Sequence, residues 1–242
     1  MRRGQHMLNW DRLLTVGVVA MAALALGGCT HQVPTIAHTH IGHAITAFDG
    51  TPEDKGLFVV AEERMTSAVA LAAGLSGERP GAEQATETRA LIEMLAGEDY
   101  GFTRALREAE SHVVFAAEAD DASANVKASA ARFSQGVADV LRRSDLATLL
   151  AGDLVRSSDD AESAQLVAQI QDLVNRTADG AGADELEVGV AQLREMMDAM
   201  VANESPPYVT VDRWYLFHLV RLPDCDTCWA WRKWANSSNR GY

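Results

Sequence analysis

The chain has 242 residues, with 21 basic and 34 acidic side chains and a formal net charge of −13 at pH 7. Such an excess of negative charge repels nucleic acid, so we expect no nucleic-acid partner, and it favours basic partners or cations. The length and the 48% of hydrophobic residues are sufficient for at least one buried core.

The N-terminus has the pattern of a secretory signal. Arg2, Arg3 and Arg12 form a basic flank, and the apolar run LLTVGVVAMAALALGG follows at residues 13–28. This run is shorter than the roughly 20 residues that a membrane-spanning helix needs, and it has the usual length of the hydrophobic region of a secretory signal. Residues 1–28 are therefore predicted to be a signal peptide.

The apolar run ends in LGGC, with Leu26 three positions before Cys29. This pattern resembles the lipobox of bacterial lipoproteins, which implies cleavage before Cys29 and acylation of its sulfur and amine. Each acyl CH₂ buried in a bilayer contributes about 0.8 kcal/mol, so two or more chains hold a protein firmly. The alternatives are an uncleaved anchor, or a plain signal peptide with an unrelated cysteine.

The resemblance implies a lipid-anchored, periplasm-facing protein of the cell envelope, whose membrane contact is the N-terminal lipid. Residues 29–36 would then be the lipidated tether. In lipoproteins of this type an aspartate after the cysteine favours the inner membrane. Thr30 occupies that position here, which slightly favours the outer membrane.

Residues 37–204 show helical hydrophobic spacing and few β-branched or aromatic clusters. The segment TPED predicts a helix start with Thr51 as N-cap and Pro52 at the first position. The buried stripe of that helix is expected at Leu57, Val60, Ala61, Met65, Ala68 and Ala72. Further helices are expected over 83–96, 102–119, 123–143 and 145–156. Another helix is expected after a serine N-cap in SSDDAES, and the last one over 184–202. The predicted fold class is all-α, an antiparallel helical bundle over residues 37–204.

The composition changes after SPP at residues 205–207. YVTVDRWYLFHLVRLP is β-branched and aromatic and predicts a strand or hairpin, with His218 packed within it. Residues 205–242 are therefore expected to form a small aromatic C-terminal appendage with β-rich character. Its tryptophans are suited to a head-group boundary, to packing over the bundle or to docking a partner.

Three histidines lie within six positions, at His38, His40 and His43. On a helix His40 and His43 share a face, whereas His38 and His40 share a side on an extended segment. A change from extended to helical backbone near Thr39 would aim all three rings into one space. Imidazole is a common ligand of Zn, Cu, Ni and Fe.

His112 is the expected partner of these histidines on a separate helix. Alanines near its helical face leave room for another helix or a planar group, and bundle interiors are where facing helices hold metals or haem. The candidate ligands for Zn, Cu or haem b are His38, His40, His43 and His112. The alternative is a structural role for these residues. The segment with His38, His40 and His43 would then be a capped helix start with solvated or hydrogen-bonded rings, and His112 would be a single core histidine.

Two further cysteines form CDTC, at Cys225 and Cys228. In an oxidising compartment an even pair predicts a disulfide. Two alternatives stay open. One is a redox-active dithiol, although the βαβ setting typical of such sites is absent. The other is half of a zinc site completed by two histidines.

The segments HTHIGHAITAFDGTPEDKGLFVVAEE (38–63) and FAAEADDASANVK (115–127) resemble a group of exported proteobacterial proteins of unassigned function. This resemblance implies that the histidine-rich segment and the acidic turn belong to one domain, at about residues 35–200. It implies no activity.

No nucleophile elbow, P-loop, dinucleotide fingerprint or calcium loop occurs in the sequence, which favours a non-enzyme. The first hypothesis is a lipid-anchored scaffold or adaptor with an envelope protein partner. The alternative is a protein that binds a metal or haem through the His38, His40 and His43 cluster, for metal handling or electron transfer. A weaker alternative is a thiol redox protein that uses Cys225 and Cys228.

Geometry distinguishes the first two hypotheses. Imidazole nitrogens converging within ~4–5 Å of a common point would favour metal binding, because ligand bonds of about 2.1 Å are then within reach. Histidines facing separate directions would favour the adaptor.

Overall fold

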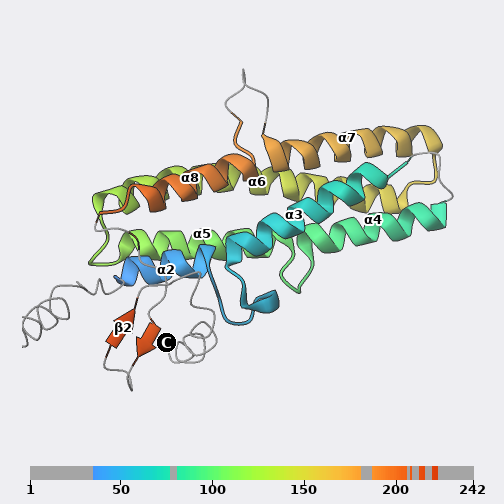
Figure 1. Ribbon diagram of the computed structural model, residues 1–242. Helices are drawn as coiled ribbons and strands as arrows, with labels where there is room; N and C mark the ends of the chain where they lie inside the picture. The colour runs from blue at the N-terminus through green and yellow to red at the C-terminus, as the bar shows by residue number, and fades with distance from the viewer. Residues whose placement is uncertain are drawn as a thin grey trace, which may run out of the picture. The chain divides into compact units, whose positions relative to one another are not determined.

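Figure 1 shows the computed structural model, which describes residues 35–76, 81–180, 187–205, 208, 213–215 and 220–222. The helices are α2 (Ile36–Ile45), the 3₁₀ turn η1 (Pro52–Asp54), α3 (Leu57–Gly74), α4 (Gly81–Ala96), α5 (Phe102–Glu118), α6 (Ala124–Arg156), α7 (Asp160–Asp179) and α8 (Val190–Ala202). Two strands of three residues follow, β1 (Arg213–Tyr215) and β2 (Val220–Leu222), and they pair antiparallel. Helices dominate the described residues, and the all-α prediction is confirmed.

Helix α6 is the longest of the described helices and packs against α4, α5, α7 and α8. It has 33 residues and is therefore about 50 Å long. Helices α5 and α4 follow one another along one side of α6, and α8 and α7 follow one another along another side (Figure 1). Helix α3 crosses this arrangement and contacts α5, α4 and α7.

A continuous apolar core fills the space between these helices. Phe58 of α3 and Phe133 of α6 are fully buried and meet edge to face, with ring centroids 5.8 Å apart. Burial of one such side chain contributes roughly 1.5–3 kcal/mol. All six positions of the stripe predicted for α3 are buried, as the helical spacing requires.

Helix α6 is continuous where the sequence predicted two helices, 123–143 and 145–156. Ser144, at the expected break, is 1% exposed, and its Oγ lies 3.3 Å from Thr103 Oγ1 of α5. Thr148 Oγ1 donates to the Ser144 carbonyl at 2.9 Å. The polar side chains in the middle of α6 thus have partners within the fold, and the helix does not need to end there.

The predicted helix start at Thr51 is found only as the short 3₁₀ turn η1, with Thr51 at its N-cap position and Pro52 as its first residue. The Thr51 hydroxyl accepts no hydrogen bond from an amide of η1 and lies 2.8 Å from Phe48 O and 2.6 Å from Lys55 O, so it closes a turn. Glu53 and its neighbour Asp54 have φ angles of 59° and 54°, which an α-helix does not accommodate. Helix α3 begins only at Leu57.

The starts of the last two helices also differ from the prediction. Helix α7 has an aspartate as N-cap in place of a serine, because the Asp159 carboxylate accepts a hydrogen bond from Glu162 N at 2.9 Å. Helix α8 begins at Val190, later than the predicted residue 184. A Cβ on Gly189 would lie 2.2 Å from Gly180 N, so the backbones of Gly180 and Gly189 are in close contact just before the first residue of α8.

Several predicted features lie outside the described residues. These are the signal peptide, the lipobox with Cys29, His218, and the Cys225–Cys228 pair. None of the helices in the described part of the chain is both long enough and apolar enough to cross a bilayer.

Candidate metal centre

Helix α2 carries the three clustered histidines and begins earlier than expected. Thr35 is its N-cap, and the Thr35 hydroxyl accepts a hydrogen bond from His38 N at 3.0 Å. The change from extended to helical backbone near Thr39, which would have aimed all three rings into one space, does not occur, since all three histidines are helical. His40 and His43 share one face of α2, and His38 points in another direction.

Asp121 fixes α2 against α5. Its carboxylate, in the turn that follows α5, accepts hydrogen bonds from Ile36 N at 2.7 Å and Ala37 N at 3.1 Å. These amides belong to the first turn of α2 and have no partner inside that helix, and a negative charge is favourable at this end. The histidine-rich segment and the acidic turn are thus in direct contact.

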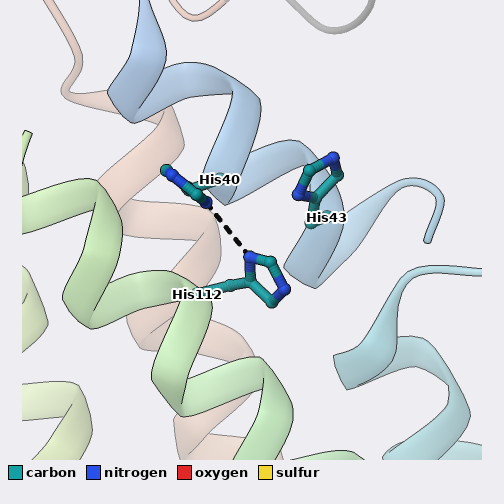
Figure 2. Close-up of side chains that lie close together, drawn as sticks. All are labelled: His40, His43 and His112. Atoms are coloured by element: carbon teal, nitrogen blue, oxygen red, sulfur yellow. Dashed lines mark hydrogen bonds between the residues drawn. The ribbon is translucent and has the colours of Figure 1, made fainter. Parts of the chain in front are cut away.

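Three imidazoles meet where α2 lies along α5. Figure 2 shows His40 and His43 of α2 beside His112 of α5. The Nδ1 atoms of His40 and His112 are 3.1 Å apart and form a hydrogen bond. His43 completes the group, with its ring centroid 4.9 Å from that of His112 and 5.9 Å from that of His40. One nitrogen from each ring lies within 4.8 Å of the other two.

Small side chains allow this close approach of the two helices. On α5, Ala105, Ala109 and Ala116 are completely buried, which agrees with the expected small-residue face near His112. On α2, the buried Gly42 faces away from this group, because a Cβ there would lie 3.4 Å from the Tyr208 hydroxyl.

The fold favours the neutral form of the three rings. Burial, followed by the nearby His43 and His40, lowers the pKa of His112 to about 4, while Glu108 opposes the shift. Burial also lowers the pKa of His43, assisted by His40 and opposed by Asp49. The pKa of His40 falls through burial, and Asp121 opposes this shift. Neutral imidazoles keep a free lone pair, which is the form that coordinates a metal.

Two phenylalanines, Phe48 and Phe115, flank the group, and neither is among the site residues predicted from the sequence. Phe48 lies 5.0 Å from His112 and 5.5 Å from His43, centroid to centroid. Phe115 lies 5.6 Å from His40 and is 48% exposed. The spacing of Phe115 three residues after His112 predicts a shared face on α5. The position of Phe48 depends on the turn after α2, which no pattern in the sequence predicts.

The structure does not bring His38 to this group. Its ring is buried and lies edge-on to Tyr208, with centroids 5.2 Å apart. Burial lowers the pKa of His38, although Glu204 and Asp121 oppose the shift. His38 therefore belongs to the packing between α2 and the chain that follows α8.

The arrangement fits a single ion better than a haem. In a tetrahedral site with bonds of about 2.1 Å, neighbouring ligand atoms are ~3.4 Å apart. The 3.1 Å pair of His40 and His112 is already close to that value, and small rotations of the His43 ring would bring the third nitrogen into range. The rings contact one another, so no porphyrin fits between them.

Among the residues that the structure describes, no other set of His, Cys, Asp or Glu side chains gathers this closely. Comparison of the chain with models of protein families, with curated proteins and with solved structures finds no match. The case for a function therefore depends on the chemistry of these three histidines.

Proposed function

We propose that this chain is a lipid-anchored protein of the bacterial cell envelope that binds one divalent transition-metal ion, Zn²⁺ or Cu²⁺, through His40, His43 and His112. Its role is metal handling on the periplasmic side of a membrane. The observation that carries this proposal is the convergence of three imidazole nitrogens within 4.8 Å from two different helices.

The electrostatics support the same proposal. Three neutral rings packed together lack the charge repulsion that protonated rings would have, and imidazole is well matched to Zn²⁺ and Cu²⁺. The acidic surface of the chain favours the approach of cations. The finer architecture that we propose is an antiparallel helical bundle over residues 37–204, with residues 205–242 as a separate aromatic appendage.

A metal titration of the full-length protein tests the proposal. The protein is purified in detergent without a histidine tag and titrated with Zn²⁺ or Cu²⁺ against a chromophoric chelator. We expect one tight site, and His112→Ala should weaken it by more than the roughly 10–100-fold that loss of a second-shell partner costs. The matched control is His38→Ala, since His38 is on the same helix but outside the group. Equal affinity for wild type and His112→Ala, with unchanged circular dichroism, would contradict the proposal.

The anchor is tested separately. Cys29→Ser should abolish incorporation of labelled fatty acid and release the chain from the membrane fraction, because the acyl chains are the proposed attachment. Fatty-acid labelling that persists in Cys29→Ser would show that Cys29 is not the attachment point.

A second candidate function, the non-catalytic adaptor, is supported by a different observation. Leu146 and Leu149 lie three residues apart on α6 and are 44% and 60% exposed. Exposed apolar side chains that share a helix face are a feature of docking surfaces. An adaptor of this kind would bind its envelope partner equally well in the presence and absence of metal.

A further inference from the structure

We infer that the ion leaves one coordination position open to a small exogenous anion, so that the loaded protein is an anion-binding centre. This inference rests on the proposed function, because it needs the ion in place. The ligand class is a monovalent anion of a few atoms, such as azide or hydroxide.

The number of ligands is the first reason. Within the described part of the chain, the group that can hold an ion contains three nitrogen ligands. Zn²⁺ is almost always four-coordinate, and sites with three protein ligands keep the fourth position for water or substrate. A tetrahedral ion held by His40, His43 and His112 therefore has one position left.

The nearby carboxylates are the groups best able to close this position, and two of them are engaged elsewhere. Asp121 accepts hydrogen bonds from two backbone amides of α2. Glu108 forms an ion pair with Arg104, with 2.8 Å between Oε1 and Nε. The third, Asp49, is exposed and acts on His43 only through its charge.

The charge of the loaded site is the second reason. Three neutral imidazoles leave the full 2+ charge of the ion uncompensated, whereas thiolate or carboxylate ligands would cancel it. The partial burial of the rings makes this charge costly, because fewer waters reach it. A bound anion lowers the net charge of the site to 1+.

The surroundings indicate the size of the anion. The three histidines are half-buried, so the site is accessible from solvent. The rings of Phe48 and Phe115 flank it on two sides. These apolar walls offer no hydrogen bonds to a large polar ligand, so a compact anion that bonds mainly to the ion is favoured.

The test uses full-length protein loaded with one equivalent of Co²⁺, whose visible spectrum reports the ligands and geometry of the ion. Azide is added in steps, and the bound metal is then measured after ultrafiltration. We expect a saturable change of the visible bands with a stoichiometry of one azide per ion, and no loss of Co²⁺ from the protein. No spectral change up to high azide would overturn the inference while leaving the proposed function intact.

Two further outcomes would also overturn it. A spectral change accompanied by loss of Co²⁺ from the protein would mean that azide competes with the histidines. Azide binding seen only in Asp49→Asn would identify Asp49 as the fourth ligand of the wild-type site. Asp49 is exposed, so this variant should fold normally. Failure of the proposed function has a different signature, namely that no Co²⁺ is retained before any azide is added.

Discussion

The Nδ1 atoms of His40 and His112 lie 3.1 Å apart, although 72 positions separate the two residues in the chain. In this contact one ring donates its proton and the other accepts it. An ion bound between them needs a lone pair from each, so the donor ring has to move its proton to its other nitrogen. Both rings are neutral before and after this step, so little net proton release accompanies metal binding.

Proton release at pH 6 is the first prediction. Three histidines with the ordinary pKa of 6.5 would be mostly protonated at pH 6 and would release about two protons when an ion binds. The pKa of His112, about 4, keeps that ring neutral at pH 6, and the lowered pKa values of His40 and His43 make these two rings less protonated than ordinary histidines. We therefore expect clearly fewer protons per ion than the two that ordinary histidines would release.

Calorimetry of Zn²⁺ binding at pH 6, in two buffers of different ionisation enthalpy, measures this number. Because the pKa values are lowered, the affinity for metal is preserved down to a lower pH than for ordinary histidines. Metal binding is lost as the pH falls toward about 4, where His112 takes up its proton. Release of two or more protons at pH 6 would contradict the account.

The second prediction concerns the attachment of α2. Asp121→Ala removes the acceptor of two hydrogen bonds from the first turn of α2, and we expect a loss of about 1 kcal/mol in the free energy of unfolding. Because His40 and His43 are on α2, metal affinity should fall several-fold, less than in His112→Ala. Urea denaturation and chelator competition measure the two effects. Asp120→Ala, at the neighbouring exposed position, is the control and should change neither.

The third prediction uses two glycines of α6. A Cβ on Gly136 would lie 2.8 Å from Leu193 Cδ2 and 3.1 Å from Val188 Cγ1, and Leu193 is itself fully buried. Gly136→Ala should therefore destabilise the protein by about 1–2 kcal/mol through overpacking against α8. A Cβ on Gly152 would meet nothing closer than Arg156 Nη1 at 3.7 Å.

Gly152→Ala should accordingly stabilise the protein by roughly 0.5–1 kcal/mol, the difference in helix propensity. Thermal unfolding of both variants provides the comparison. A stabilising Gly136→Ala would mean that α6 and α8 do not pack as closely as the structure shows.

The fourth prediction concerns a buried ion pair. Arg143 has a side chain that is 10% exposed, and its Nη1 lies 2.8 Å from Glu187 Oε1. Glu187 also pairs with Arg176 at 2.6 Å. Glu187→Gln leaves the buried guanidinium without its negative partner, so we expect a loss of about 3 kcal/mol.

Arg142 provides the matched control for this variant. It is the residue just before Arg143 on α6 and pairs with Asp139, but its side chain is 73% exposed. Arg142→Ala should change the free energy of unfolding by less than about 0.5 kcal/mol, because solvent screens such pairs. Equal losses in the two variants would show that the Arg143 pair is not buried in solution.

The helical fold and the positions of two of the three site histidines, His40 and His43, follow from local sequence patterns. The spacing of His40 and His43 places them on one face of any helix, and the apolar stripe of α3 is buried at every position that periodicity indicates. These features depend only on the period of the helix. The identity of His112 as the partner was predicted from its small neighbours, which the structure shows to be buried.

Other parts of the site depend on contacts between distant segments. The cap formed by Thr35 moves the start of α2 and turns His38 away from the group, and the sequence prediction missed this cap. The role of Asp121 could not be predicted, because its hydrogen-bond donors are 84 and 85 residues away. The continuity of α6 through Ser144 likewise depends on a partner in α5.

The most direct test of the proposed metal centre is elemental analysis of the full-length protein, purified without a histidine tag and without chelators from the cells that naturally make it. We predict close to one equivalent of zinc or copper per chain, reduced to background in the His40→Ala/His43→Ala double variant and retained in His38→Ala. Wild-type protein that contains no metal above the buffer blank, and takes up none when Zn²⁺ or Cu²⁺ is added, would contradict the account.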